Sequence, residues 1–436
     1  MLGNIVKWAN ERTPEVIKEI FAPVIRLMLT NNKNFKKTYN LLNKLNDKEQ
    51  LEYQKSQVKD LMSYVYENCE YYNKNIDLYQ VNLQSQDVYE ELKKLPIMKR
   101  EDVISNYSQM ISKEKIRFYH ALTGGTTGEA LDIIQDYDSI MKEKAYIYHY
   151  WSKLGYDYKT SKLLTFRGAY SGNKLARYNP VYNEIIVSPF MLTNESVQDY
   201  LDIIDQYKPE YIQGYPTTMK NLCRIIEEEN CTLSVKLKGM FFISEEVKLE
   251  DRQYIEKVLG CPSLAFYGHT ERSVFGEEIK HNDYVFNNTY GYTELIPTLI
   301  PDEYQIIVTG LINRKMPLLR YDTGDIAIIK EGQTFIKSHC DKFVYGYNRE
   351  NIDLSKSIFT MEGLKSLKKY QFIQNEIGKI ELNILDNIEP LGLKKLEEEL
   401  NNEFLGVLDF TVNKVEKLKL TKRGKQQNVV QNCNLS

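Results

Sequence analysis

The sequence lacks any cysteine pattern, long hydrophobic run or strong net charge. Its six cysteines are scattered and form no CxxC pair, which argues against a zinc ribbon or a disulfide scaffold and favours buried free thiols. The formal net charge is only −3, so the chain has no overall basic footprint for nucleic acid. No internal repeat, low-complexity tract or proline-rich linker is visible. These absences set nucleic-acid binding aside and predict a folded protein.

No segment of the sequence predicts stable membrane insertion. The best candidate, residues 16–29, is broken by Lys18, Glu19 and Arg26 and is too short to cross a bilayer. We expect a packed amphipathic helix there, with contact to a membrane surface as the alternative. Charged residues also interrupt the N-terminus where a signal peptide would need an apolar run. The sequence therefore predicts a cytoplasmic location.

Length and composition predict a globular protein of more than one domain. The chain has 436 residues, of which 42% are hydrophobic and 27% charged, and a single core stops growing well below that length. The pattern of elements shortens beyond about residue 335. We therefore expect a large N-terminal domain over residues 1–336 and a small, mobile α+β C-terminal domain over 337–436.

Helical and strand-like segments alternate between residues 194 and 268. Helical patterns cover 197–207, 222–226 and 249–259, and strand-like runs cover 211–213, 239–243 and 264–267. Such β-α-β order predicts an α/β fold with a doubly wound, mostly parallel sheet. Ligands of such sheets bind at the carboxyl ends of the strands, so the loops after these strands should carry the function.

Further elements are expected on either side of this region. Helical spacing covers residues 51–69, with Leu51 at the start of its apolar face, and also 137–154, which ends at Gly155. Strands are expected at 163–166, 304–309 and 320–328, the last of them with a turn at Thr323-Gly324, and a charged helix near 393–400. These segments would extend the sheet region and build the C-terminal domain.

A loop rich in glycine and hydroxyl groups suits a phosphate. It reads Thr123-Gly124-Gly125-Thr126-Thr127-Gly128, and small residues let backbone N–H groups close around phosphate oxygens. It is not a P-loop, because Glu129 stands where that motif needs lysine, and it is not GxGxxG. Taken alone, it is equally compatible with a flexible surface turn.

Three other motifs accompany the loop: Tyr267-Gly268-His269-Thr270-Glu271, Arg320-Tyr321-Asp322-Thr323-Gly324-Asp325 and Gly424-Lys425. Together the four motifs resemble the adenylate-forming superfamily of acyl-CoA synthetases and peptide-synthetase adenylation domains. Within it, the chain is similar to the subgroup that holds phenylacetate–CoA ligases and CapK capsular polysaccharide proteins. The stretches Leu95-Pro96-Ile97, Gln213-Gly214-Tyr215-Pro216 and Val308-Thr309-Gly310-Leu311 support this likeness, which runs from about residue 50 to 431.

The resemblance implies ATP and Mg²⁺ as cofactors and assigns residues to them. Hydroxyls of the glycine-rich loop, Thr126 above all, would bind the β- and γ-phosphates, and Glu271 would hold Mg²⁺, a hard cation that prefers oxygen ligands. Asp325 would accept both ribose hydroxyls, although a turn residue in a Thr-Gly-Asp hairpin is the alternative. The remaining nucleotide-binding residues would be Ser244, Glu245, Tyr267, Gly268, His269, Thr270 and Arg320. His269 could equally be a packed or hydrogen-bonded imidazole.

The resemblance also assigns a catalytic lysine, a substrate pocket and a hinge. Lys425 would bridge the substrate carboxylate and the α-phosphate, where a cation offsets the repulsion of two anions most in the transition state. Lys417, Lys419, Lys422 and Arg423 beside it are better interpreted as a solvated basic face. The pocket would draw on Gly168, Gln213, Gly214, Tyr215 and Pro216, and Asp341 would be the hinge.

Some positions depart from the family pattern. Asp322 stands where many relatives have arginine, and Glu129-Ala130 replaces a residue followed by proline. The usual Gly-Arg before the hinge acid is missing at Asp341. No cysteine follows Glu271 in residues 275–279, so no zinc site is expected there.

The implied activity is the joining of a carboxylic acid to AMP, with release of pyrophosphate and transfer of the acyl group. The likeness to phenylacetate–CoA ligase favours CoA as the acceptor. The likeness to CapK favours an amine or sugar precursor of a surface polysaccharide, and a carrier-protein thiol is a third option. A nucleotide-binding scaffold without catalysis is the rival from another class, against which Glu271, Asp325 and Lys425 argue.

Overall fold

The computed structural model describes residues 31–122, 131–167, 175–189, 192–244, 246–337, 343–348, 351–354, 361, 364, 367, 370–385, 388–416, 418 and 429–433. These residues form two compact units: Met1–Ala121 with Ile133–Lys337, and Leu122–Asp132 with Ser338–Ser436. The predicted boundary after residue 336 stays a prediction, because the second unit also includes Leu122–Asp132. The helix expected over residues 16–29 lies outside the described residues.

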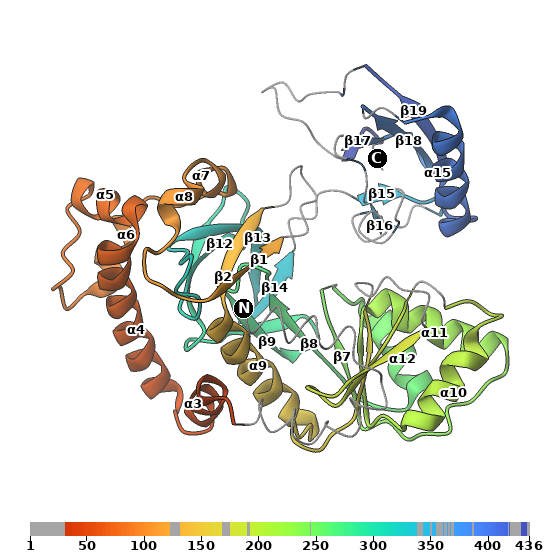
Figure 1. Cartoon of the computed structure of the whole chain (residues 1–436), viewed down its shortest axis with the longest axis horizontal. Coiled ribbons are helices and arrows are strands. Elements are labelled where there is room, and N and C mark those ends of the chain that lie inside the picture. Colours follow the sequence, from red (N-terminus) through yellow and green to blue (C-terminus); the bar gives the residue numbers. More distant parts are fainter. Residues whose placement is uncertain are drawn as a thin grey trace. The chain divides into compact units, whose positions relative to one another are not determined.

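The first unit is built around an eight-stranded sheet in the order β10-β9-β8-β7-β6-β3-β5-β4 (Figure 1). Its strands are β3 (Leu163–Phe166), β4 (Ala176–Asn179), β5 (Glu184–Val187), β6 (Tyr211–Gly214), β7 (Gly239–Phe242), β8 (Ser263–Gly268), β9 (Phe275–Lys280) and β10 (Asp283–Phe286). Strands β8, β7, β6, β3 and β5 run parallel, and the remaining strands pair antiparallel. This arrangement confirms the predicted α/β fold class.

Helices cover both faces of this sheet, as a doubly wound fold requires. One face packs on α9 (Tyr137–Trp151) through an aromatic core in which Trp151 stacks on Phe241 with ring centroids 4.0 Å apart. The other face packs on α10 (Val197–Tyr207), α11 (Pro216–Glu228) and α12 (Leu249–Leu259). Both α10 and α12 have the bounds expected from the sequence. The buried face of α10 is apolar, whereas that of α12 carries Arg252 beside Ile255 and Leu259. A short 3₁₀ turn, η1 (Ser152–Leu154), ends at Gly155, whose φ of 82° confirms the predicted stop.

A second sheet carries the Thr-Gly-Asp motif. It has the order β11-β12-β13-β14, formed by β11 (Gly291–Pro297), β12 (Glu303–Gly310), β13 (Tyr321–Lys330) and β14 (Gln333–Lys337). A two-stranded sheet of β1 (Phe118–Leu122) and β2 (Asp132–Asp136) precedes α9. The N-terminal helices are α3 (Lys33–Leu42), α4 (Asp47–Asn68), α5 (Glu70–Leu78), α6 (Val88–Lys93), α7 (Arg100–Ser105) and α8 (Tyr107–Met110).

Helix α4 begins earlier than expected, and the residue on its buried face differs from the predicted one. Asn46 and Glu49 form a capping box that starts the helix at Asp47, which satisfies free N–H groups of the first turn. Leu51, expected on the buried face, is 50% exposed. Gln54 is buried instead and donates to the carbonyl oxygen of Gly291 at 2.8 Å. The inward position is therefore occupied by a polar side chain that binds β11.

The second unit contains a four-stranded sheet in the order β19-β18-β17-β20 and a two-stranded sheet of β15 and β16. Its elements are β15 (Phe343–Tyr345), β16 (Asn351–Asp353), β17 (Tyr370–Glu376), β18 (Lys379–Ile384), α15 (Pro390–Glu403), β19 (Asp409–Lys414) and β20 (Val429–Gln431). Leu396 and Leu400 of α15 pack into the same core as Phe372 and Leu382 of the sheet. The predicted charged helix near 393–400 is confirmed as part of α15.

Among the described residues, no helix is both long enough and apolar enough to cross a membrane.

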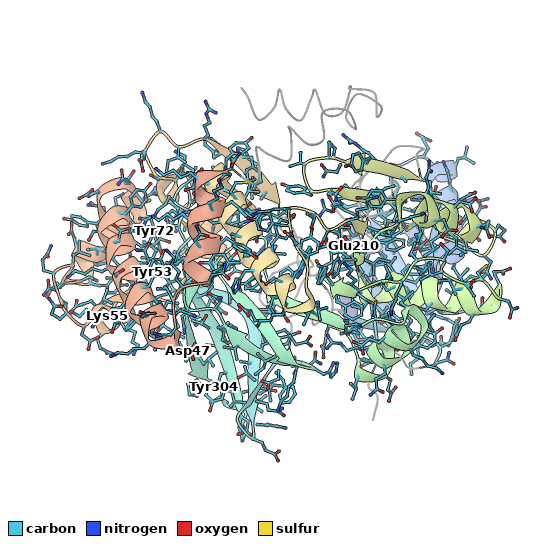
Figure 2. All side chains as sticks on the ribbon, turned by 90° about the horizontal axis from the view of Figure 1, so that it is seen from below. Asp47, Tyr53, Lys55, Tyr72, Glu210 and Tyr304 are labelled. Carbon is cyan, nitrogen blue, oxygen red and sulfur yellow. The ribbon has the colours of Figure 1, made fainter. Side chains whose placement is uncertain are left out.

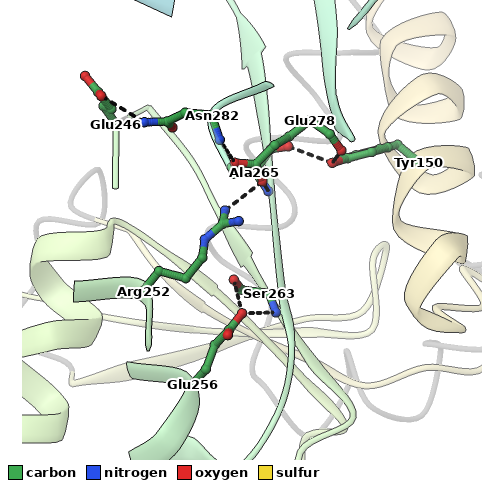
Figure 3. Close-up of polar contacts among 8 residues, drawn as sticks. All are labelled: Tyr150, Glu246, Arg252, Glu256, Ser263, Ala265, Glu278 and Asn282. Carbon is green, nitrogen blue, oxygen red and sulfur yellow. Dashed lines mark hydrogen bonds and ion pairs between the residues drawn. The ribbon is translucent and has the colours of Figure 1, made fainter. Parts of the chain in front are cut away.

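A buried ion pair joins helix α12 to the eight-stranded sheet (Figure 3). Arg252 Nη2 lies 2.7 Å from Glu278 Oε2, and the two side chains are 10% and 2% exposed. The same carboxylate accepts the backbone N–H of Ala265 at 3.1 Å and that of Asn282 at 2.9 Å. Tyr150 of α9 reaches the carbonyl oxygens of Ala265 and Glu278 from the opposite face. Glu278 is thus held by groups on α12, β8 and the β9–β10 turn.

Removing one partner of this pair should strongly destabilise the first unit. We expect Arg252→Ala to lower the free energy of unfolding by about 3–5 kcal/mol, because Glu278 would remain as an unpaired buried charge. Lys220→Ala is the matched control, since Lys220 pairs with Asp251 next to Arg252 but the two side chains are 52% and 31% exposed. Its loss should be much smaller. Denaturant unfolding of both variants makes the comparison, and equal losses would contradict the role assigned to Glu278.

Candidate active site

The Thr-Gly-Asp motif forms a β-bulge rather than the predicted turn. Ile307 pairs with Asp322 and Gln305 pairs with Ile326, so the residues Thr323 to Asp325 lie opposite Ile306 alone. Gly324 has a φ of 77°, which glycine adopts without steric cost. Glycine was expected here for a turn, and its positive φ also suits a bulge. The bulge bends the continuous strand β13 instead of reversing the chain, and bulges of this kind are common beside active sites.

Side chains within the motif satisfy the backbone groups that the bulge leaves without strand partners. Thr323 Oγ1 donates to the carbonyl oxygen of Ile306 at 2.9 Å and accepts the N–H of Asp325 at 3.1 Å. Asp322 Oδ1 accepts the N–H of Gly324 at 2.9 Å. Asp322, the departure from the family pattern, therefore has a local role in fixing the bulge, and the result is a fixed position for Asp325.

Two side chains contact Asp325, one from strand β8 and one from the turn after it. Tyr267 donates its hydroxyl to Asp325 Oδ2 at 2.7 Å, and His269 Nε2 lies 3.0 Å from the same oxygen. Asp325 is only 6% exposed. The structure thus brings together Tyr267, His269 and Asp325, although they lie on different sheets.

Burial and the Asp325 carboxylate set the protonation of this cluster. Burial, followed by the charge of Asp325, raises the pKa of Tyr267 well above 10.0, so its hydroxyl stays a donor. Burial alone would lower the pKa of His269. The hydrogen bond to Asp325 and the charges of Asp325 and Glu271 outweigh that effect and raise the pKa of His269 above 6.5.

Glu271 lies two residues beyond His269 and contacts the strand that carries Asp325. Tyr321 donates its hydroxyl to Glu271 Oε1 at 3.2 Å. Burial and the Glu271 charge raise the pKa of Tyr321 far above its ordinary value. Within the part of the chain that the structure describes, no group of three or more His, Cys, Asp or Glu side chains could hold a metal ion. A single accessible carboxylate suits Mg²⁺, which takes its other ligands from phosphates and water.

A polar network that the motifs did not indicate supports the turn after β8. Gln135 of β2 accepts the Tyr119 hydroxyl and donates to the carbonyl oxygen of Thr270. Arg272 pairs with Glu143 of α9 at 2.8 Å. Gln135 is 2% exposed, but it stands between Ile134 and Asp136, so no sequence pattern singles it out. Residues flanking the glycine-rich loop are therefore tied to the Thr270 turn.

Arg320 is held by structural contacts. Its Nε and Nη2 atoms bind the two oxygens of Glu294 at 2.9 and 3.1 Å, while Nη1 donates to the carbonyl oxygens of Lys93 and Leu95. Only one of the five guanidinium donors remains. Contact between Arg320 and a nucleotide stays a prediction. The same contacts explain why the motif Leu95-Pro96-Ile97 accompanies the Arg320 motif, since the N–H of Met98 also donates to the Arg320 carbonyl oxygen.

The predicted substrate-pocket residues lie at the carboxyl end of β6. Gln213 is buried and accepts the Thr165 hydroxyl at 3.4 Å. A Cβ atom on Gly214 would lie 3.1 Å from the Phe166 Cβ, so a larger residue would crowd Phe166. Tyr215 precedes Pro216, the first residue of α11. On the neighbouring strand, Ser244 follows β7 in a left-handed conformation with a φ of 59°.

Several predicted site residues lie outside the described residues. They are Thr123, Gly124, Gly125, Thr126, Thr127, Gly128, Gly168, Glu245, Asp341 and Lys425. Their roles remain predictions.

Comparisons with known proteins identify the fold. No family model matches the chain. Protein CapK of Staphylococcus aureus is 24% identical over 457 residues, an alignment that covers 98% of this chain and 100% of CapK. The chain has the fold of the adenylate-forming superfamily. This confirms the resemblance indicated by the motifs, and the structural comparisons below agree with it.

Two crystal structures of 2-hydroxyisobutyryl-CoA ligase share the architecture. One, in complex with 2-HIB-AMP and CoA in the thioesterification state, gives a TM-score of 0.58 at 15% identity and covers 89% of this chain and 91% of its own. The other, in the post-adenylation state, gives 0.52 at 14% identity and covers 89% and 90%. Likeness at this level concerns the fold.

The raised pKa of His269 predicts a measurable change when Asp325 loses its charge. In Asp325→Asn, burial is opposed only by the Glu271 charge, so the pKa of His269 should fall. The charged His269–Asp325 pair therefore stabilises the wild type fully below the unfolded pKa of His269, about 6.5. This stabilisation is lost as pH rises through the higher pKa of His269 in the folded protein. NMR titration of the His269 ring reports the pKa. An unchanged value would show that Asp325 does not control this imidazole.

Proposed function

We propose that this chain is an ATP-dependent, AMP-forming ligase. A carboxylate oxygen attacks the α-phosphorus of ATP and pyrophosphate leaves; the acceptor's thiol or amine then attacks the acyl carbon and AMP leaves. The observation that carries the proposal is the Tyr267–His269–Asp325 cluster beside Glu271, at the carboxyl end of β8. Its support is the adenylate-forming fold and the full-length similarity to CapK.

In this proposal each described residue acts on one part of the nucleotide. Asp325 accepts the ribose hydroxyls, because its carboxylate is fixed by the bulge and by two donors on one oxygen. The ring of Tyr267 would offer a flat face beside the base, and Ser244 and Glu245, following the family resemblance, would line the adenine pocket. Glu271 would hold Mg²⁺, which neutralises charge on the phosphates. The threonines of residues 123–128 would orient the β- and γ-phosphates.

The proposal also includes the acceptor of the acyl group. We favour the CoA thiol, following the subgroup resemblance to phenylacetate–CoA ligases. The similarity to CapK favours a second candidate, acyl or aminoacyl transfer to an amine or sugar precursor of a surface polysaccharide. Loading of a carrier-protein thiol is a further option, which adding a phosphopantetheinylated carrier would test. A cytoplasmic location belongs to the same proposal.

Pyrophosphate exchange tests the adenylation step. Purified protein should exchange labelled pyrophosphate into ATP only when a suitable carboxylate and Mg²⁺ are both present. Glu271→Gln should raise the Mg²⁺ concentration needed for half-maximal exchange, because it removes a ligand charge and keeps the side-chain size. If the protein binds ATP but shows no exchange with any acid of a broad panel, the alternative of a nucleotide-binding scaffold without catalysis would be favoured. Unchanged metal dependence would remove Glu271 from the metal's ligands.

Lys425→Ala should separate the two half-reactions. The family uses its small domain in two orientations, and the lysine serves only the first. Adenylate formation should therefore fall by roughly 10²–10³-fold, the loss typical of one transition-state donor. Transfer from a chemically supplied acyl-adenylate should be nearly unaffected, because another face of the domain then meets the site. Single-turnover kinetics of each step measure both, and equal losses in the two steps would refute the alternating role.

A further inference from the structure

A buried amide anchors the residue that precedes Glu271. Gln135 of β2 is 2% exposed, and its Nε2 donates to the carbonyl oxygen of Thr270. Its Oε1 accepts the hydroxyl of Tyr119 from β1. Burial raises the pKa of Tyr119 to about 12, so this hydroxyl stays a donor. Because a carbonyl oxygen can only accept, the amide nitrogen must face Thr270, and the orientation of the Gln135 amide is fixed from both ends.

An ion pair anchors the residue that follows Glu271. Arg272 Nε lies 2.8 Å from Glu143 Oε2, and the two side chains are 12% and 22% exposed. Arg272 Nη1 also donates to Ser139 Oγ at 3.0 Å. Glu143 and Ser139 belong to α9, which directly follows β2. The strand that carries Gln135 therefore continues into the helix that binds Arg272.

The backbone of this turn has a costly conformation. Arg272 has a φ of 53°, in the left-handed region where the Cβ atom is crowded. Its N–H donates to the carbonyl oxygen of His269 at 3.1 Å and closes the turn. A residue keeps such a conformation only where its surroundings hold it there. The contacts of the Arg272 guanidinium supply this restraint.

The Glu271 carboxylate is held directly at one oxygen. Tyr321 donates to Oε1 at 3.2 Å, and within the described part of the chain no hydrogen bond reaches Oε2. Apart from this bond, the position of the carboxylate depends on the backbone between Thr270 and Arg272. Mg²⁺ requires its oxygen ligands at about 2.1 Å in nearly ideal octahedral geometry. Small shifts of this backbone should therefore change how well Glu271 can serve as a ligand.

We propose that Gln135 and Arg272 are positioning residues, which hold Glu271 in the geometry that binds Mg²⁺ together with ATP. Each acts through the backbone beside Glu271 and not by contact with the metal or the nucleotide. The inference rests on the proposed function and adds two residues that lie outside the motifs.

A purely structural role is the alternative. The contacts of Gln135 and Arg272 also join β2 and α9 to the turn after β8, so their loss could lower only the stability of the first unit. The two roles differ in what they change. A positioning role alters the Mg²⁺ requirement of the folded protein, whereas a structural role alters only the amount of folded protein.

The Mg²⁺ dependence of pyrophosphate exchange tests the inference. Gln135→Met keeps the side-chain size and removes both hydrogen bonds. We expect it to raise the Mg²⁺ concentration for half-maximal exchange by about 3- to 10-fold, the range for one neutral hydrogen bond. Arg272→Met should raise it by about 10- to 100-fold, because hydrogen bonds to a charged group are stronger. Tyr119→Phe, which only frees the amide to rotate, should have a smaller effect in the same direction.

Two further variants serve as controls. Lys153→Met removes the ion pair between Lys153 Nζ and Glu277 Oε2, 2.7 Å apart, which joins the turn after α9 to β9. It should leave the Mg²⁺ requirement unchanged. Arg272→Lys keeps the charge but loses the planar guanidinium, so it should retain part of the wild-type behaviour. Melting temperatures of all variants reveal any that fail to fold.

A double-mutant cycle with Glu271→Gln tests whether Gln135 acts through Glu271. Once the carboxylate is gone, its position no longer matters, so adding Gln135→Met to Glu271→Gln should raise the Mg²⁺ requirement no further. Residues that act through one another give such non-additive effects. Increases that add in full would show that Gln135 acts independently of Glu271 and would overturn the inference.

Calorimetric titration with ATP gives a readout that needs no catalysis. The wild type should bind ATP more tightly with Mg²⁺ than with EDTA. Gln135→Met and Arg272→Met should reduce this difference and leave the affinity measured in EDTA unchanged. Equal losses of affinity with and without Mg²⁺ would indicate a structural role and overturn the inference, as would a wild type whose ATP affinity does not depend on Mg²⁺.

The outcomes separate this inference from the proposed function. Exchange whose Mg²⁺ requirement is the same in the wild type and in both methionine variants would overturn the inference and leave the ligase proposal standing. If no acid supports exchange, the ligase proposal fails. Calorimetry then decides the inference alone, and a Mg²⁺-dependent ATP affinity that both variants reduce would support it.

Discussion

The Oδ2 atom of Asp325 accepts both the Tyr267 hydroxyl and the His269 ring, and this shared oxygen joins the two large sheets of the first unit. The contact depends on the bulge, because a regular β13 would turn residue 325 to another direction. Thr323 and Gly324 are therefore needed for their backbone geometry as much as for any contact with a ligand. The carboxylate is positioned before a nucleotide arrives, which reduces the cost of ordering it on binding.

The N-terminal helices hold the strand that carries this carboxylate. Tyr72 of α5, labelled in Figure 2, donates to the carbonyl oxygen of Pro317 at 2.9 Å and accepts the N–H of Leu319 at 3.2 Å. The Arg320 guanidinium then binds Glu294 and the backbone before Met98. Helices far away in the sequence thus fix the start of β13, and through it the position of the bulge.

Local sequence patterns predicted much of the fold, and the motifs predicted the residues of the Tyr267–His269–Asp325 cluster. The features that were missed depend on contacts between residues far apart in the sequence. The helical patterns of α10 and α12 predicted the correct bounds, and the motifs selected Tyr267, His269 and Asp325. A turn and a bulge both use glycine at positive φ, so the sequence could not distinguish them at Gly324. Gln54 could not be preferred to Leu51, because its partner Gly291 lies far along the chain.

The clamp around Arg320 has a consequence for how this chain can vary. Lysine could not replace Arg320, since a single ammonium group cannot reach both Glu294 oxygens and two carbonyl groups at once. A change at either partner alone leaves an unpaired buried charge. We therefore expect changes at Arg320 and Glu294 to be tolerated only when both positions change together. In a genetic screen for loss of activity, variants at these two positions would appear among the active-site variants. Their loss of activity would reflect a smaller amount of folded protein.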